Sequence, residues 1–222
     1  MSLITFEREF FAGVDVGQVN DWTAVAVTEV VRAVPRTGIH FGLLPQATAE
    51  AKETPLRLDL CHLERIPLGT LYPEQVNILR DLLRQPILGE VQTYLDMTGV
   101  GRPVHQMLKA AGMRSLHGIS ITGAQGEAKR QPYGWSVGKA ELVNRVQIEL
   151  QTGRLRLGRR LPDVDKLVRE LKEFRAKPTA NGHMTFNARE GQHDDLVLAL
   201  SYAVFGALRP RPVQSIEVRF AS

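Results

Sequence analysis

The segment FFAGVDVGQVNDWTAVAVTEVV, residues 10–31, decides how the rest of the chain is interpreted. Its first part, Phe10 to Val16, is a short apolar run, which is typical of a buried strand. Its last part, Trp22 to Val31, is rich in Thr, Val and Ala and favours a second strand. The residues between them, Gln18 to Asp21, fit a turn. The segment therefore predicts an antiparallel hairpin.

The residues that follow predict a mixed sheet with helices on both faces. Leu56 to Ile66 alternates in a way that buries one face, so it extends the hairpin into an antiparallel meander of three strands. Two further strands, Val91–Leu95 and Leu116–Ile121, are each preceded by a helical pattern, at Pro73–Gln85 and Pro103–Ala111. Helical crossovers of this kind join parallel strands. We therefore expect an α/β fold with a mixed five-stranded sheet.

The second half of the chain reads as helices separated by short strands and loops. Helices are expected at Lys139–Gln151, Asp163–Phe174 and His193–Ala207, and short strands at Arg154–Leu157 and Met184–Phe186. Clusters of Gly and Pro predict a loop or an insertion over residues 33–55 and a mobile loop over residues 122–138. We expect one domain over residues 1–208 and a peripheral tail over residues 209–222.

The composition indicates a soluble protein with a modest preference for a polyanionic partner. Of its 222 residues 43% are hydrophobic, enough for a substantial core, and the formal net charge is +4. Cys61 is the only cysteine in the sequence, so an internal disulfide is excluded. The six histidines show no metal-ligand spacing, and no apolar run approaches the roughly 20 residues of a membrane span. The charged first residues do not resemble a secretory signal. We therefore expect a cytoplasmic location.

Acidic residues stand at the ends of three apolar elements. Asp15 closes the first strand, Asp96 follows the fourth, and His193-Asp194-Asp195 opens the last helix. If the first and fourth strands are parallel neighbours, Asp15 and Asp96 emerge at the same edge of the sheet, about 4.8 Å apart. Clustered carboxylates repel one another unless a cation neutralises them, and hard oxygen ligands select Mg²⁺ or Mn²⁺. A pair of such ions can hydrolyse a phosphodiester.

Each of these aspartates also has a simpler local interpretation. Asp15 can serve a turn before Gly17, and Asp96 can hydrogen-bond the loop that follows it. Asp194 can cap its helix, with Asp195 favoured by the helix dipole. The occurrence of all three at strand or helix ends favours the metal site. Asp194 and Asp195 lie about 100° apart on a helix, so one should be the stronger ligand, and we favour Asp195 weakly.

The acidic motifs resemble those of the nuclease domain of bacteriophage large terminases, which has a ribonuclease-H-like fold. The similar segments, from about residue 10 to 207, are Gly13-Val-Asp-Val-Gly17 with Asp21-Trp-Thr-Ala24, Leu95-Asp-Met-Thr-Gly-Val-Gly101, Val137-Gly-Lys-Ala-Glu-Leu142, Leu161–Phe174, and Gly191-Gln-His-Asp-Asp-Leu-Val-Leu-Ala-Leu200. In the segment Leu161–Phe174 the matching positions are Leu167, Glu170, Leu171 and Phe174. Among all the similar segments, Gly191–Leu200 is the most specific.

The resemblance implies a metal-dependent endonuclease that cuts double-stranded phage DNA in the bacterial host cell. It implies Asp15, Asp96, Asp194 and Asp195 as metal-binding and catalytic residues, Lys139 as a further catalytic residue, and the use of Mg²⁺ or Mn²⁺, with two ions expected. Portal protein, small terminase subunit and a separate ATPase motor are the partners it suggests. The sequence holds no Gly-x4-Gly-Lys-Ser/Thr motif, so we expect no ATP hydrolysis. Whether the chain is an excised domain, a separate nuclease or a prophage remnant stays open.

Two other functions remain alternatives, and one basic segment remains ambiguous. A Holliday-junction resolvase shares the fold, but its second acidic residue is typically Glu, whereas Asp96 stands here. A non-catalytic DNA-binding packaging module is the other alternative, against which the intact acidic positions argue. The arginines at positions 154, 156, 159 and 160 either follow a DNA backbone or form an ordinary exposed face.

Overall fold

The computed structural model describes residues 4–17, 21–35, 57–123, 126–173, 175–178, 184–187 and 193–209. Its helices are α1 (Tyr72–Leu83), the short 3-10 helix η3 (Pro86–Leu88), α2 (Gly101–Ala110), α3 (Lys139–Gln151), α4 (Val164–Glu173) and α5 (Asp195–Ala207). Its strands are β1 (Ile4–Asp15), β2 (Thr23–Pro35), β3 (Arg57–Ile66), β4 (Gln92–Asp96), β5 (Leu116–Thr122), β6 (Lys129–Gln131), β7 (Gly134–Gly138), β8 (Leu155–Leu157), β9 (Arg175–Pro178) and β10 (Met184–Asn187).

The five expected strands form the centre of the sheet. Strands β1, β2 and β3 make the antiparallel meander, and β1 also pairs with β4 in parallel, with Val14 opposite Leu95. Strand β5 continues the parallel part beside β4. The predicted fold class, a mixed sheet with helices on both faces, is therefore confirmed, as is the predicted neighbourhood of the first and fourth strands.

The sheet is wider than the five strands predicted. It has eight described strands in the order β6-β7-β5-β4-β1-β2-β3-β8. Strands β6 and β7 occupy much of the segment predicted as a mobile loop, and this part of the prediction is wrong. Glycines suggested a loop there, but Gly134 is required by close packing: a Cβ at this position would stand 1.8 Å from the carbonyl oxygen of Gly118 on β5. Its φ of +149° also favours glycine.

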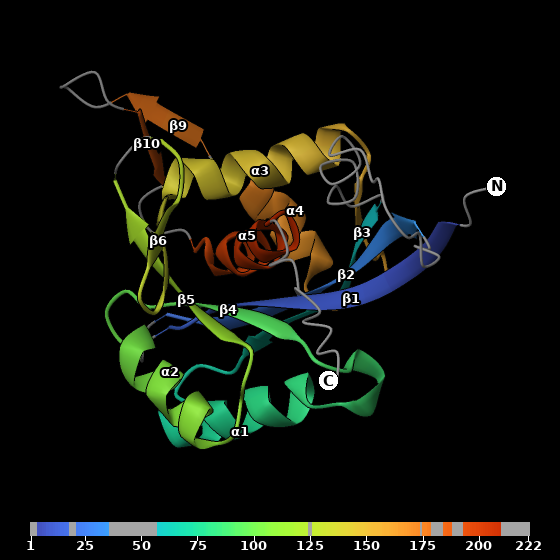
Figure 1. Cartoon of the computed structure of the whole chain (residues 1–222). Coiled ribbons are helices and arrows are strands. Elements are labelled where there is room, and N and C mark those ends of the chain that lie inside the picture. Colours follow the sequence, from blue (N-terminus) through green and yellow to red (C-terminus); the bar gives the residue numbers. More distant parts are fainter. Residues whose placement is uncertain are drawn as a thin grey trace, which may run out of the picture.

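Three layers of structure surround the sheet (Figure 1). Helices α1 and α2 cover one face, and α5 covers the other, with α3 and α4 packed over α5. Two apolar clusters correspond to the two faces. One contains α5 with residues such as Phe11 and Tyr94, and the other contains the buried faces of α1 and α2 with residues such as Val14 and Leu95. Alternate residues of each strand therefore point to opposite sides.

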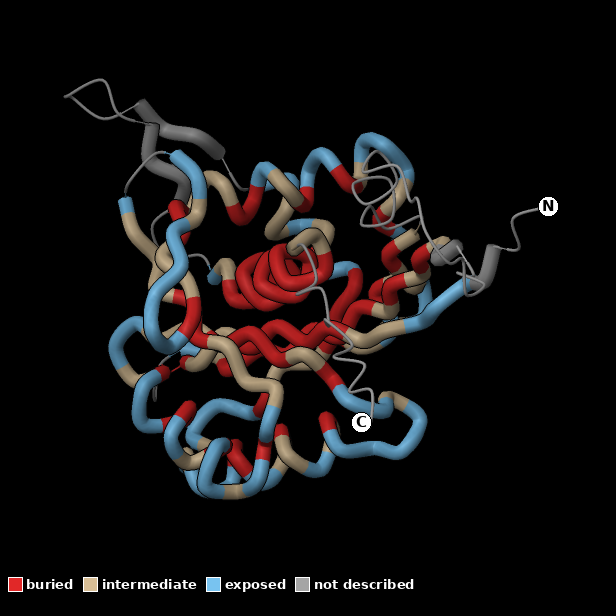
Figure 2. The backbone as a smooth tube through the Cα atoms, viewed as in Figure 1, coloured by how far each residue is buried: buried red, intermediate tan, exposed pale blue. Residues whose placement is uncertain are grey.

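Helix α5 lies at the centre of the molecule and is buried along its whole length (Figure 2). It approaches β1 most closely at Gly13, where a Cβ would stand 1.9 Å from the carbonyl oxygen of Ala199 and 2.6 Å from the backbone nitrogen of Ala203. The glycine of the first acidic motif thus lets the helix lie directly on the strand that ends in Asp15.

Charged side chains from other elements cap both ends of α5. At its start, Glu170 of α4 accepts a hydrogen bond from the backbone N–H of Val197 through Oε2, at 3.2 Å. At its end, the buried guanidinium of Arg32 on β2 donates to the carbonyl oxygen of Ala207. The two contacts satisfy backbone groups that a helix leaves unpaired, and the charge of Arg32 complements the helix dipole.

Several sequence predictions fall partly or wholly outside the described residues. These are most of the segment 33–55, most of the turn expected at Gln18–Asp21 and nearly all of the tail from 209. The strand predicted at Met184–Phe186 corresponds to β10, which pairs with β9 in a separate two-stranded sheet. Within the described part of the chain, none of the helices has the length and apolar character needed to cross a membrane.

Candidate metal centre

Asp15 and Asp96 are the last residues of adjacent parallel strands. Because Val14 is paired with Leu95, the two aspartates that follow lie side by side at the carboxyl edge of the sheet. Both side chains are half-buried. The sequence prediction that these strands bring Asp15 and Asp96 to one edge agrees with this pairing.

The strand alternation directs both carboxylates to the side of the sheet that α5 covers. Two residues before Asp15 is Gly13, which contacts α5, and two residues before Asp96 is Tyr94, which belongs to the apolar cluster of α5. The hydroxyl of Tyr202, on α5, donates to Asp15 Oδ1 at 3.5 Å. The first acidic motif therefore faces the helix whose start carries the third motif.

Asp194 and Asp195 stand at the start of α5, at the same edge. Asp195 is the first residue of the helix, and only 5% of its surface is exposed. Asp194 precedes it and accepts a hydrogen bond from Lys139 Nζ at 2.6 Å through Oδ2. Lys139 begins α3 directly after β7, so the lysine motif and the third acidic motif meet as an ion pair.

The four carboxylates influence one another electrostatically. Loss of hydration raises the pKa of Asp15 well above its ordinary value, and repulsion from Asp96, Asp195 and Asp194 raises it further, while Lys139 opposes the shift. Burial also raises the pKa of Asp96, against hydrogen bonds from Thr98 and the charge of Lys139. At Asp15, the repulsion from the neighbouring carboxylates therefore outweighs the attraction of Lys139.

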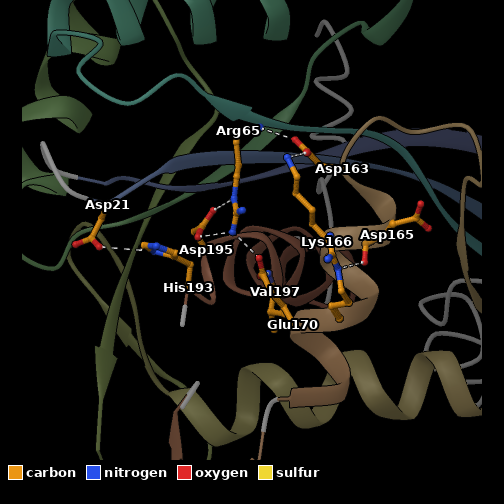
Figure 3. A network of polar contacts seen from close by, with 10 residues as sticks. Asp21, Arg65, Asp163, Asp165, Lys166, Glu170, His193, Asp195 and Val197 are labelled. Carbon is orange, nitrogen blue, oxygen red and sulfur yellow. Dashed lines mark hydrogen bonds and ion pairs between the residues drawn. The ribbon is translucent and has the colours of Figure 1, made fainter. Parts of the chain in front are cut away.

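Arg65 at the end of β3 holds Asp195 in place (Figure 3). Its Nε donates to Asp195 Oδ2 at 2.6 Å and its Nη2 to Asp195 Oδ1 at 2.9 Å. The same Nη2 lies 2.5 Å from Oε1 of Glu170, and the backbone N–H of Arg65 donates to Asp163 Oδ2 at 3.2 Å. A bidentate pair of this kind fixes both the position and the plane of a carboxylate.

The register of the sheet explains why Arg65 reaches this site. Asp15 is paired with Ala24 of β2, and Ala24 is paired with Arg65 of β3. Residues directly opposite one another in antiparallel strands point to the same face. Arg65 therefore projects, like Asp15, towards the start of α5. Burial alone would lower its pKa, but Asp195 and Glu170 together leave the pKa raised above the ordinary value.

Glu170 shares this single guanidinium with Asp195. Burial and the charge of Asp195 raise the pKa of Glu170 to about 8, while Arg65 opposes the shift. Because Asp195 and Glu170 share the guanidinium of Arg65, protonation of Glu170 is favoured. Sequence reasoning placed Glu170 in a family segment without a role, and it did not single out Arg65 or Tyr202. Arg65 could be found only through strand register, and Tyr202 through its place two helical turns after Asp195.

The local interpretations of the aspartates have mixed outcomes. Asp96 Oδ1 accepts a hydrogen bond from the backbone N–H of Thr98 at 2.8 Å, so it does order the loop after β4. Asp194 occupies the N-cap position of α5 but makes no side-chain capping hydrogen bond. The backbone N–H of Gly17 donates to the hydroxyl of Thr23, not to Asp15. Among the described residues, therefore, no turn contact accounts for the carboxylate of Asp15.

The chemistry of these side chains suits a hard divalent cation, although in this structure they are not arranged around one ion. Four carboxylates supply the oxygen ligands that Mg²⁺ and Mn²⁺ prefer, and a cation would offset the repulsion that raises the pKa of Asp15. In the part of the chain that is described, no three Asp, Glu, His or Cys side chains converge closely enough to hold one ion. Asp194 and Asp195 are instead engaged by Lys139 and Arg65.

Comparisons with known proteins agree with this fold. Among solved structures, the chain is similar to the large terminase nuclease of thermophilic phage G20c with bound magnesium, at 21% identity and a TM-score of 0.58 over 90% of this chain and 82% of that one. The cobalt-bound form gives 21% and 0.57 over 90% and 81%. The large terminase nuclease domain of Thermus phage P74-26 gives 19% and 0.56 over 88% and 78%. At such identities the likeness establishes the fold.

A search of curated proteins found no match. The sequence profile of one family, described as the terminase RNaseH-like domain, matches residues 71–206, which is more than half of the chain. This region includes the second acidic motif, the lysine motif and the start of α5, and β1 adds the first acidic motif beside them. The chain therefore belongs to the terminase RNaseH-like domain family.

Proposed function

We propose that this protein is a metal-dependent endonuclease that cleaves double-stranded DNA with little sequence preference. The observation that supports it most is the meeting of Asp15 and Asp96, at the ends of adjacent parallel strands, with Asp194 and Asp195 at the start of α5. Family membership supports the same reaction, and two of the similar phage structures are described with bound magnesium or cobalt.

In this proposal the four aspartates hold two ions, either Mg²⁺ or Mn²⁺. Bound ions would supply an activated water and stabilise the leaving oxygen of the phosphodiester. Arg65 keeps the Asp195 carboxylate in one plane. Lys139 limits the negative charge at this edge through its ion pair with Asp194. In this proposal its ammonium also contacts a phosphate of the DNA.

The proposed partners follow from the family alone. They are double-stranded DNA as substrate and, within a packaging machine, a portal protein, a small terminase subunit and an ATPase motor. The setting is the cytoplasm of a bacterial host. We propose that residues 1–208 form the nuclease domain and that residues 209–222 form a peripheral tail.

The decisive experiment is a cleavage assay on supercoiled plasmid. We expect nicked and linear products with Mg²⁺ or Mn²⁺, and none with EDTA. The variant Asp165→Asn, which removes an exposed carboxylate from α4, should cut like the wild type. Absence of cutting across a range of both ions would contradict the proposal. A four-way junction beside a linear duplex tests the resolvase alternative, and calorimetric titration with Mn²⁺ tests the non-catalytic one, which should bind the ion weakly or not at all.

A further inference from the structure

Two adjoining cavities lie between α2 and the β6–β7 hairpin, on the face of the sheet that α1 and α2 cover. The larger has a volume of about 420 Å³ and the smaller about 190 Å³, and both are lined by His105, Lys109 and Tyr133. The wall of the larger one includes Met97, the residue that follows Asp96. We call these two cavities together the α2–β7 groove.

The α2–β7 groove is positively charged. Arg102 and Lys109 line the larger cavity, and Lys109, Arg114 and Arg130 line the smaller, while neither is lined by an acidic residue. Burial lowers the pKa of His105, and the charge of Lys109 lowers it further. Among the described residues, Arg102, Lys109 and Arg114 have no carboxylate within ion-pair distance. This charge is therefore available to an anionic ligand.

His105 gives a second, independent sign of a ligand. It lines both cavities and is only 9% exposed, and its Nε2 has no hydrogen-bond partner within the described structure. A buried polar nitrogen without a partner is unfavourable, and such atoms normally bond to protein or to a bound molecule. A ligand in the groove with a hydrogen-bonding edge would satisfy it.

Tyr133 adds a flat aromatic surface at the rim of the groove. Its side chain is 76% exposed, although large aromatic groups favour burial. It occupies the turn between β6 and β7, directly before Gly134, whose tight packing on Gly118 holds the hairpin against β5. Sites that bind single-stranded nucleic acid combine a cationic groove with such aromatic side chains, on which bases stack.

We propose that the α2–β7 groove binds an unpaired nucleotide of the DNA strand. Arg102 and Lys109 take the phosphate, Tyr133 stacks on the base, and His105 Nε2 bonds its edge. The larger volume lies within the range of about 300–1,000 Å³ typical of small-molecule sites, so it has room for a nucleotide. The inference rests on the proposed nuclease function, because that function makes a DNA strand the polyanion that the protein binds.

Binding can be tested without cleavage. A fluorescently labelled short oligothymidine is titrated with the full chain in EDTA, and fluorescence anisotropy gives the Kd. Tyr133→Ala should weaken binding roughly tenfold, since stacking contributes about 1–3 kcal/mol per base. Lys109→Ala and Arg102→Ala should each weaken it and reduce the slope of log K against log salt by about 0.7 for each phosphate that is no longer neutralised. All three side chains are exposed, so these variants should remain folded.

A matched control separates a site from general charge attraction. Arg156 is an exposed arginine on β8, at the opposite edge of the sheet, and Arg156→Ala removes the same charge as Arg102→Ala. We expect Arg156→Ala to bind the oligonucleotide like the wild type. Equal losses of affinity in Arg102→Ala and Arg156→Ala, or wild-type binding by Tyr133→Ala and Lys109→Ala, would overturn the inference.

Two further titrations identify the ligand. A blunt duplex should lose little affinity in Tyr133→Ala, and an equal loss for duplex and single strand would overturn the assignment to an unpaired nucleotide. Free thymidine monophosphate should compete only weakly, and competition as strong as that of the oligonucleotide would assign the groove to a free nucleotide instead. The plasmid assay distinguishes the two proposals. If the strand binds as expected but plasmid is not cut, only the proposed function is contradicted. If plasmid is cut but the groove variants bind like the wild type, only the inference about the groove is contradicted.

Discussion

Asp15 is the last residue of β1, and three other carboxylates and one lysine lie close enough to change its pKa. Their repulsion and the loss of hydration raise its pKa, which means that the folded, metal-free protein disfavours its charge. A group with a raised acidic pKa destabilises the fold at pH values above that pKa, and the penalty is absent at low pH, where the group is protonated in both states. Neutral pH without metal is therefore the costly condition for this residue.

The variant Asp15→Asn tests this account. It should lower the cleavage rate on the order of a hundredfold or more, because a metal ligand is removed. In EDTA at neutral pH its melting temperature should stay unchanged or rise, because the uncompensated charge is gone while the shape is kept. Plasmid cleavage and calorimetric melting measure the two effects. A large fall in melting temperature with cleavage retained would assign Asp15 a structural role.

At the scale of the element, the contact between α5 and β1 depends on Gly13. A methyl group there would stand within 2 Å of a backbone carbonyl of α5, and backbone on both sides leaves little room to yield. Gly13→Ala should therefore destabilise the protein by about 1–3 kcal/mol or more, as overpacking of a core does. It should also shift Asp15 relative to the start of α5.

Chemical denaturation measures this effect, with Gly123→Ala as the control. Gly123 follows β5, and a Cβ there would meet no atom within 4 Å, so the same change should cost little. A free energy of unfolding that is equal in the two variants would show that α5 can move away from β1 without loss.

Glu170 connects α4 with the start of α5, and its titration should be visible in the stability of the protein. With its pKa at about 8 in the fold, against an ordinary 4.5, the folded state holds a proton that the unfolded state releases between these values. The contribution is fully present below about pH 4.5 and is lost as pH rises towards 8. In Glu170→Gln this fall in stability with rising pH should be absent.

The free energy of unfolding, measured by urea denaturation in EDTA, should therefore fall less steeply from about pH 5 to 8 in Glu170→Gln than in the wild type. The difference should be on the order of a few kcal/mol, since one pKa unit corresponds to about 1.4 kcal/mol. Glu173→Gln, an exposed glutamate on the same helix, should keep the wild-type slope. Identical slopes in all three proteins would show that Glu170 is charged throughout.

At the scale of the whole molecule, the candidate centre joins parts of the chain that are far apart in sequence. The end of β1, the end of β4, the start of α3 and the start of α5 each contribute a charged side chain. A cation bound by these side chains would therefore bind the folded chain and not the unfolded one. Binding of this kind stabilises the fold by mass action.

Mn²⁺ at a hundred times its dissociation constant should stabilise the folded protein by about 2.7 kcal/mol. For a domain of this size the melting temperature should rise by about 5–10 °C over its value in EDTA. Differential scanning calorimetry measures the shift. Asp15→Asn should show little of it, while Asp165→Asn should show all of it. An equal rise in Asp15→Asn would place the ion elsewhere.

The sequence was most informative where chemistry conflicts with local structure. Asp15 and Asp96 could be singled out because an aspartate is unfavourable inside an apolar strand. The meander followed from the Thr, Val and Ala content of the second strand and the hydrophobic alternation of the third. Strands β6 and β7 were not predicted, because backbone pairing with β5 tolerates the glycines that suggested a loop. Arg65 was missed because its place depends on pairing across β2, which no local pattern contains.

The position of α5 in the chain has a consequence for synthesis on the ribosome. About 180 residues separate the end of β1 from the start of the helix that covers it. At translation speeds of about 5–20 residues per second, the apolar face of β1 waits roughly 10–40 s for its covering helix. During that interval the nascent chain presents an uncovered apolar sheet face, which exposes it to aggregation until α5 is made.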